Sequence, residues 1–100
     1  MTPKQAATGF AAMGSDARLQ VLQALVRAGE AGLLVGDIQK RTGIAASTLA
    51  HHLKSLSSAG LIVQTRQGRA VRNTANYDHL RTLADFILEE CCSEENHPHD

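Results

Sequence analysis

Hydrophobic residues recur with the period of an α-helix along the first third of the chain. The pattern predicts helices over residues 3–13 and about 16–28, each followed by a glycine that favours a helix end. A proline opens the first helix, and Ser15 or Asp16 can cap the second. The buried stripe of the second helix is expected to comprise Leu19, Leu22 and Val26, widened by Val21 and Leu25.

The middle of the chain has the pattern of a helix–turn–helix unit. Residues 32–36 form a short apolar connector, and a short helix is predicted over about 37–41. After a break at 42–44, a longer helix is predicted over about 47–59, with a glycine as its stop. Its buried stripe is Leu49, Leu53 and Leu56. A short helix, a glycine-containing turn and a second helix form a DNA-binding unit in many folds.

The last part of the chain predicts a β-hairpin and one more helix. Residues 61–65 and 70–74 are typical of strands, and 66–69 is a turn that contains Gly68. The last helix is predicted over about 77–92. Its apolar face comprises Leu80, Leu83, Ala84, Ile87 and Cys91. The expected fold is therefore mainly α with a β-hairpin wing, a winged helix-turn-helix, with a homodimer interface built from the first and last helices.

Length and composition indicate a small globular protein. It has 100 residues, of which 43% are hydrophobic and 20% are charged, as in one globular domain. We expect a single domain over 1–92 and a flexible polar tail over 93–100. No apolar run reaches the roughly 18 residues that span a bilayer, and no signal core follows the start. The expected localisation is cytoplasmic, with no membrane partner.

A formal net charge of zero hides a segregation of charge along the chain. Residues 38–73 hold no acid, and residues 74–100 hold seven acids and one Arg. The six cations of the acid-free block are Lys40, Arg41, Lys54, Arg66, Arg69 and Arg72. A polyanion would be attracted to this block and repelled by the end of the chain, which indicates double-stranded DNA as the partner.

The predicted helix over 47–59 is the candidate recognition helix. Removing its Leu stripe leaves hydroxyls, imidazoles and an ammonium on the outer face, all able to bond phosphates or base edges. The base-edge candidates are Ser47, Thr48, His51 and His52. Lys40, Arg41 and Lys54 are interpreted as phosphate contacts, and Arg66 and Arg69 suit phosphates or the minor groove. A solvated polar face is the alternative interpretation of the two histidines.

The candidate recognition helix and the segments around it resemble a known protein family. Residues 43–62, from Gly-Ile-Ala-Ala-Ser-Thr to Gly-Leu-Ile, resemble the signature of ArsR/SmtB-family repressors. Residues 15–19 resemble the opening of that family's second helix, and the turn 66–69 fits its wing. The resemblance covers about residues 5–92. It implies a homodimeric winged-helix repressor that binds an inverted-repeat operator and releases it when an inducer binds.

The resemblance also implies places where an inducer could bind. One arsenical site of the family needs cysteines at the third helix, and residues 33–38 contain none. The zinc-type site of the last helix needs an Asp and a His near its start, which Asp78 and His79 supply. Its other end offers Glu89 or Glu90, but Phe86 lies near the place of the second histidine.

Cys91 and Cys92 resemble the vicinal pair of an arsenic-responsive subgroup of the family. That subgroup has a third cysteine a few residues on, where this chain offers His97 or His99. Soft thiolates suit a soft, thiophilic centre. The hypothesis is therefore a repressor released by a trivalent arsenical or antimonial, with no obligatory cofactor. The alternatives are a thiol-based redox or persulfide sensor, a zinc- or nickel-type sensor, and a purely structural pair.

Two further classes of protein fit the sequence less well than a DNA-binding regulator does. A small thiol enzyme is disfavoured, because adjacent cysteines lack the Cys-x-x-Cys spacing and no phosphate loop or nucleophile–base motif is present. A winged helix that binds only proteins is disfavoured by the acid-free basic block.

Surrounding glutamates and the negative end of the last helix should keep free thiols protonated. That favours a metalloid site over an unassisted redox switch.

Overall fold

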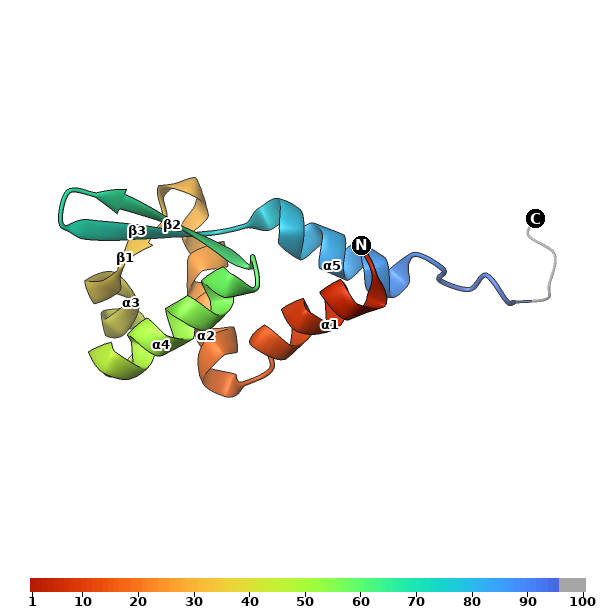
Figure 1. The fold of residues 1–100 in the computed structure, drawn as a ribbon, viewed down its shortest axis with the longest axis horizontal. Coiled ribbons are helices and arrows are strands. Elements are labelled where there is room, and N and C mark those ends of the chain that lie inside the picture. The colour runs from red at the N-terminus through yellow and green to blue at the C-terminus, as the bar shows by residue number, and fades with distance from the viewer. Residues whose placement is uncertain (96–100) are drawn as a thin grey trace.

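The computed structural model describes residues 1–95 and shows a winged helix-turn-helix (Figure 1). The expected fold class is therefore confirmed. The elements in chain order are α1 (Pro3–Ala12), α2 (Asp16–Ala28), the 3-10 turn η1 (Gly29–Ala31), β1 (Leu33–Leu34), α3 (Val35–Thr42), α4 (Ala46–Ser58), β2 (Ile62–Gln67), β3 (Ala70–Ala75) and α5 (Tyr77–Leu88). The division into a domain over 1–92 and a tail over 93–100 stays a prediction.

The wing is part of a three-stranded antiparallel sheet with the order β1-β3-β2. Gln67 pairs with Ala70 across a two-residue turn, in which Gly68 has a φ of 63° that favours glycine. The strand β1 lies within residues 32–36, for which the sequence predicts only a connector. Two residues give too short a pattern for a strand to be recognised from sequence.

The side chain of Asn73 connects β1 to the rest of the sheet. Its side chain is completely buried in the central strand β3. Its Nδ2 donates to the carbonyl of Leu33 at 3.2 Å, and its Oδ1 accepts from Gln64 Nε2 at 2.9 Å. At Gly32 a Cβ would come within 2.4 Å of the Asn73 carbonyl oxygen, so this approach requires glycine. One amide thus links all three strands.

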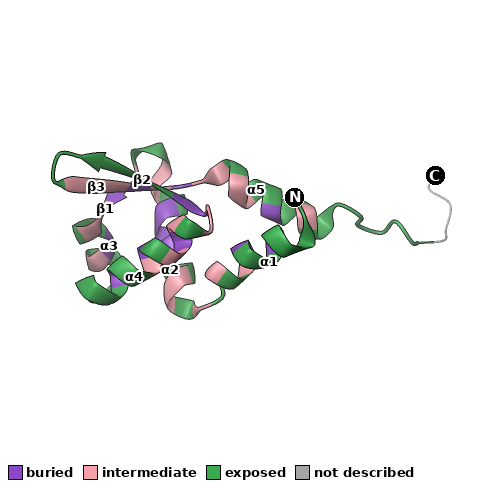
Figure 2. Cartoon of the chain, viewed as in Figure 1, coloured by how far each residue is buried: buried purple, intermediate pink, exposed green. Residues whose placement is uncertain are grey.

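The core lies between α2, α3, α4 and the sheet. Figure 2 shows the buried positions concentrated on α2 and α4, and the expected Leu stripe of α4 is fully buried. The stripe expected for α2 is partly wrong, because Leu19 and Val26 are each 42% exposed. The buried residues of α2 are Val21, Leu22, Ala24 and Leu25. On the helix surface Leu19 and Val26 lie next to each other. Both lie beyond Leu22, just past the edge of the face that α4 and β3 cover.

The terminal helices α1 and α5 pack side by side, away from the wing (Figure 1). A Cβ at Gly9 would meet Leu83 Cδ1 at 2.8 Å, so a small residue allows this close packing. Of the expected apolar face of α5 only Leu83 is buried; Ile87 is 64% and Leu88 62% exposed. The predicted extension of the helix to residue 92 is wrong, because α5 ends at Leu88.

Within residues 1–95, every helix is too short or too polar to cross a lipid bilayer.

The role of Asn73 predicts a stability effect. Replacing Asn73 by Leu removes the buried side-chain hydrogen bonds to the Leu33 carbonyl and to Gln64 Nε2. We expect the free energy of unfolding to fall by about 1–3 kcal/mol, measured by urea denaturation. Gln67→Ala, which removes only the exposed hydrogen bond from Arg72 Nε, should cost under about 1 kcal/mol. Equal losses in the two variants would contradict this role of Asn73.

Candidate nucleic-acid interface and thiol site

The first turn of α4 presents polar groups to solvent. Leu49 and Leu53 bury the inner face, so Ser47, Thr48 and His51 are exposed on the outer one. The N-cap residue, Ala45, makes no side-chain hydrogen bond to the helix. The backbone N–H groups of the first turn are therefore open to an acceptor from outside the chain.

The two histidines of α4 are adjacent but not equivalent. Their ring centroids are 6.3 Å apart, with the ring planes tilted by 53°. His51 is exposed, whereas His52 is half-buried and its Nδ1 is buried without a hydrogen-bond partner among the described residues. An unpartnered buried acceptor costs less than an unpartnered buried N–H, so the proton of neutral His52 belongs on Nε2. His51 offers both ring nitrogens to a ligand, and His52 offers Nε2.

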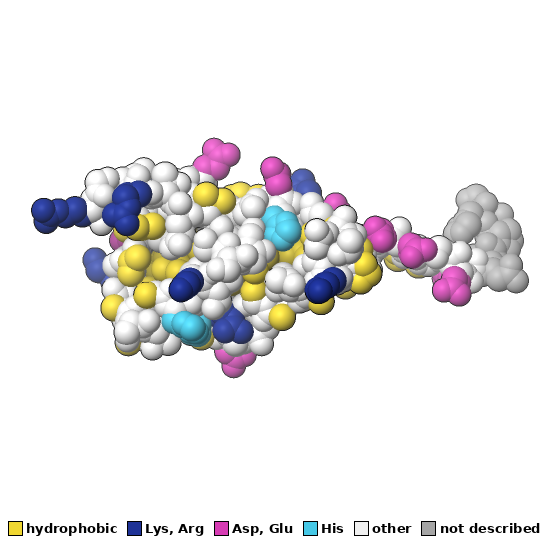
Figure 3. All heavy atoms as spheres, viewed as in Figure 1, with side chains coloured by type: hydrophobic (Ala, Val, Ile, Leu, Met, Phe, Trp, Pro, Cys, Tyr) yellow, Lys and Arg dark blue, Asp and Glu magenta, His cyan; other side chains and the backbone are white. Residues whose placement is uncertain are grey.

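Five of the six cations of the basic block are exposed. Lys40 and Arg41 lie in the last turn of α3, and Lys54 lies on α4. Arg66 is on β2 and Arg69 is in the turn of the wing. Figure 3 shows dark-blue side chains at the end of the wing and over α4. The structure therefore brings these five predicted contacts and the α4 hydroxyls into one half of the molecule.

Arg72, the sixth cation, has a structural role instead. It is half-buried on β3, where its Nε donates to Gln67 Oε1 at 3.0 Å and its Nη1 donates to the carbonyl of Ala31 at 2.6 Å. These bonds link the wing to η1. Sequence alone could not separate Arg72 from Arg66 and Arg69, because the distinction depends on which face of the hairpin each residue occupies.

Acidic side chains gather at the opposite end of the molecule. The described chain is elongated, with extents of 58 × 22 × 22 Å. Figure 3 shows magenta side chains following one another along the segment beyond α5, far from the wing. The charge segregation of the sequence is thus a separation in space, and the basic end alone suits a polyanion.

The two cysteines lie just beyond α5 and converge. Cys91 N–H donates to the Leu88 carbonyl at 2.8 Å, and Cys92 then takes a left-handed φ of 65°. The two Sγ atoms are 3.3 Å apart, and both residues are exposed. A helix through residue 92 would have pointed them about 100° apart. The alternative that Cys91 belongs to an apolar core stripe is contradicted by its exposure.

The pKa of the Cys92 thiol is raised. The largest cause is its hydrogen bond with Cys91, followed by its hydrogen bond with Glu95, and the smallest cause is burial. A carboxylate that accepts a bond from a thiol stabilises the protonated form. The direction agrees with the expectation from the sequence, and Glu95 is identified as the carboxylate that acts on Cys92.

Within residues 1–95, the structure does not group the other proposed metal ligands with Cys91 and Cys92. Asp78 is exposed and His79 is half-buried beside Gly60, both at the first turn of α5. His97 and His99 lie outside the described residues. Within residues 1–95, no three His, Cys, Asp or Glu residues are grouped as a metal site would require.

The start of α5 is linked to both neighbouring helices. Asn76 caps α5 and donates from Nδ2 to the carbonyl of Gly60, at the end of α4, at 2.9 Å. The Tyr77 hydroxyl donates to the carbonyl of Val26 in α2 at 3.0 Å. These two hydrogen bonds hold the start of α5 against α2 and against the residue that follows the end of α4.

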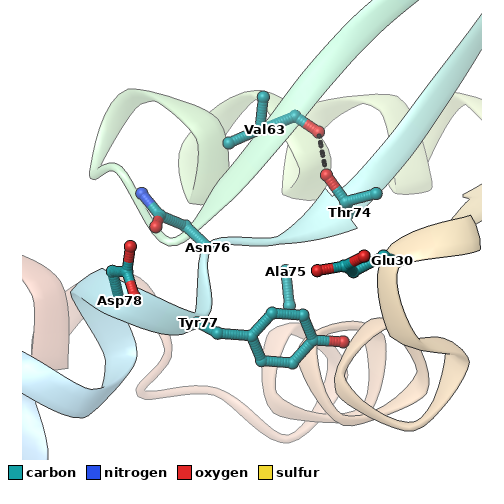
Figure 4. A pocket seen from close by; sticks show the side chains of 7 residues that line it. All are labelled: Glu30, Val63, Thr74, Ala75, Asn76, Tyr77 and Asp78. Atoms are coloured by element: carbon teal, nitrogen blue, oxygen red, sulfur yellow. Dashed lines mark hydrogen bonds between the residues drawn. The ribbon is translucent and has the colours of Figure 1, made fainter.

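A cavity of about 320 Å³ opens at this junction. In Figure 4, Glu30 and Asp78 lie on either side of Tyr77, and Thr74 donates to the Val63 carbonyl at 3.4 Å. The sequence pattern gives no role to Glu30 or to the Tyr77 hydroxyl, because the junction joins segments far apart in the chain.

The chain matches the helix-turn-helix domain family over residues 13–65. It belongs to that family. The structure is similar to an ArsR-like transcriptional regulator from Rhodococcus sp. RHA1, with 27% identity, a TM-score of 0.75, and coverage of 91% of this chain and 82% of that one. A search of curated proteins gave no match.

Two other solved structures extend the comparison. The homodimeric winged helix-turn-helix DNA-binding domain Mb0332 from Mycobacterium bovis, a possible ArsR-family regulator, is 26% identical, with a TM-score of 0.69 over 96% of this chain and 89% of that one. Reduced HlyU from Vibrio cholerae is 25% identical, with a TM-score of 0.69 over 89% and 90%. The chain is therefore a helix-turn-helix protein, and the Rhodococcus and Mycobacterium structures to which it is similar are ArsR-type regulators and not enzymes.

The contact between Glu95 and Cys92 predicts a change in thiol reactivity. Glu95→Gln removes the carboxylate that stabilises the protonated thiol, so the pKa of Cys92 should fall. More thiolate is then present near pH 7, and alkylation by iodoacetamide should be faster in Glu95→Gln than in the parent chain. Glu94→Gln is the matched control. Equal rates in both variants would show that Glu95 does not control the thiol.

Proposed function

We propose that this helix-turn-helix protein is an ArsR-type transcriptional repressor, a homodimer that holds an inverted-repeat operator and releases it when a trivalent arsenical binds Cys91 and Cys92. The single observation that carries the inducer assignment is the 3.3 Å separation of the two Sγ atoms. The exposed cations and polar α4 surface at the other end of the molecule support the operator contact.

The DNA contact follows from which side chains α4 exposes. A helix of this kind enters the major groove with its N-terminal residues nearest the bases. Ser47, Thr48, His51 and His52 would meet base edges there. Lys40, Arg41 and Lys54 would contact phosphates, and Arg66 and Arg69 at the wing would contact phosphates or the minor groove.

Dimerisation follows from the face that α5 leaves exposed. Ile87 and Leu88 are exposed, and Leu80, Phe86 and Phe10 are partly buried beside them. A second copy that covers this face around a two-fold axis would remove the apolar area from water. Two α4 helices would then meet successive major grooves about 34–36 Å apart, as inverted half-sites require.

The spacing of the sulfurs favours a pyramidal trivalent centre. If each sulfur lies roughly 2.3 Å from a shared centre, a right angle there separates the sulfurs by about 3.3 Å and a tetrahedral angle by about 3.8 Å. The observed 3.3 Å matches the first. Trivalent arsenic and antimony bond through nearly perpendicular directions. A third position could be filled by His97, His99, water or a free thiol, and organic arsenicals with two open positions need only the pair.

Binding of the inducer would act on the DNA-binding surface through a shift of α5. A centre that binds both thiols fixes the chain just after Leu88 and changes the end of the helix that we assign to the dimer interface. Because Asn76 and Tyr77 link α5 to α4 and α2, a shift of α5 would move the recognition helices off their operator spacing. A coupling of about 1–3 kcal/mol would weaken operator binding roughly 5–150-fold.

The redox and zinc- or nickel-type alternatives have less support. For the redox alternative, the raised pKa of Cys92 lowers the thiolate fraction that would attack an oxidant or persulfide. A tetrahedral divalent metal needs about four ligands, and residues 1–95 group fewer than three.

The thiol assignment is tested by two serine variants. Cys91→Ser and Cys92→Ser should bind operator DNA as tightly as the parent chain and should no longer release it with arsenite or methylarsenite. Fluorescence anisotropy on the DNA upstream of its own gene measures both properties. Ser93→Ala is the control and should respond normally. Release of either cysteine variant by the arsenical would show that the inducer binds elsewhere.

The DNA-contact assignment is tested at the wing. Arg66→Glu with Arg69→Glu removes two cations and adds two like charges beside phosphates, so operator affinity should fall at least about 100-fold at low salt. Arg81→Glu, an exposed charge reversal on α5, should change affinity far less. A wing variant that binds DNA like the parent chain would instead favour a winged helix that contacts another protein.

A further inference from the structure

A second cavity lies between α1, the start of α2 and the far end of α4. Its volume is about 510 Å³, and alanines form much of its wall. The polar groups that line it are Thr8 of α1, Arg18 of α2, and Ser55 and Ser58 of α4. Among the described residues, no carboxylate lines this cavity.

Arg18 is oriented before any ligand arrives. Its backbone N–H donates to Ser15 Oγ at 3.1 Å, and its side-chain Nε donates to the carbonyl of Ala12. The residue is half-buried, and within residues 1–95 no carboxylate is paired with it, including the exposed Asp16 nearby. A guanidinium has five N–H donors in a fixed plane, so four remain for a ligand.

The hydroxyls of the cavity add donors to this cation. Thr8 donates to the Lys4 carbonyl at 3.1 Å and so offers only an acceptor. Ser55 and Ser58 make no side-chain hydrogen bond to the described residues, so both hydroxyls are open to a ligand. A half-buried guanidinium beside two free hydroxyls, with no acid in the described wall, is the donor set that binds a phosphate oxyanion.

The cavity continues the surface that we assign to DNA. Ser55 and Ser58 lie four and seven residues after His51, which places them on the same side of α4 one and two turns along. A strand of DNA whose groove receives the first turn of α4 would run its backbone beside these later turns. Arg18 lies outside the acid-free block 38–73, so the charge pattern of the sequence does not indicate it.

We propose that this cavity binds one backbone phosphate of the DNA duplex, with Arg18 as its cation and Ser55 and Ser58 as hydroxyl donors. The inference rests on the proposed operator contact and adds a site to it. The bound phosphate would position the end of α4 and the start of α2 against the duplex. A phosphate contact carries no base information, so it would strengthen specific and non-specific binding alike.

The test is the salt dependence of DNA affinity. Arg18→Gln should weaken binding about tenfold or more and reduce the slope of log affinity against log salt by about one, equally on an upstream duplex and on a random duplex of the same length. Arg18→Lys keeps the charge and should keep the slope. Arg81→Gln removes an exposed cation of α5, which does not line this cavity, and should change neither quantity. Ser58→Ala should weaken binding about two- to fivefold with the slope intact.

Different results would assign Arg18 and its cavity a different role. A lower melting temperature for Arg18→Gln with an unchanged salt slope would make Arg18 a structural residue only and overturn the proposal. Inorganic phosphate at constant ionic strength is a second probe, read by NMR of the Arg18 side chain. If it binds there while Arg18→Gln leaves the slope unchanged, the cavity takes a free anion and not DNA. If the parent chain binds neither duplex, the DNA-binding function itself fails.

Discussion

The short link between β3 and α5 sets the geometry on which the function depends. Two hydrogen bonds, from Asn76 to the Gly60 carbonyl and from Tyr77 to the Val26 carbonyl, fix the start of α5 against α4 and α2. The direction of α5 in turn determines where its exposed apolar end, at Ile87 and Leu88, can meet a second copy. In the proposed dimer, the spacing of the two recognition helices is therefore set by residues outside the proposed DNA and inducer sites.

The exposed cations and the thiol pair lie at opposite ends of the molecule. The wing and α4 expose cations and contain no acid, while the segment after α5 is acidic and holds the thiol pair. The acids orient the molecule, because only the basic end is attracted to a polyanion. Glu95 also favours the protonated Cys92 thiol, because its hydrogen bond raises the pKa of that thiol. A thiophilic centre would displace the thiol protons on binding, so its apparent affinity would rise with pH.

Sequence predicts the elements well where local signals are strong. Glycines, a capping serine and Leu periodicity give the helices their bounds within a few residues, and Gly68 gives the wing its turn. The strand β1 escapes prediction, because its pairing depends on the buried Asn73 amide forty residues away. The predicted α5 runs too far, to residue 92, because the apolar period continues through Ile87, Leu88 and Cys91 with no glycine to stop it. The cysteines are recognisable in the sequence but their convergence is not, since it depends on the left-handed backbone of Cys92.

The central claim is that the thiol pair and the DNA surface are energetically coupled, and coupling of two sites is reciprocal. The most direct measurement is the affinity of the reduced protein for methylarsenite, by isothermal titration calorimetry, with and without saturating operator DNA. We expect operator to weaken methylarsenite binding by the same factor by which methylarsenite weakens operator binding. Equal methylarsenite affinities for the free and the DNA-bound protein would contradict the coupling.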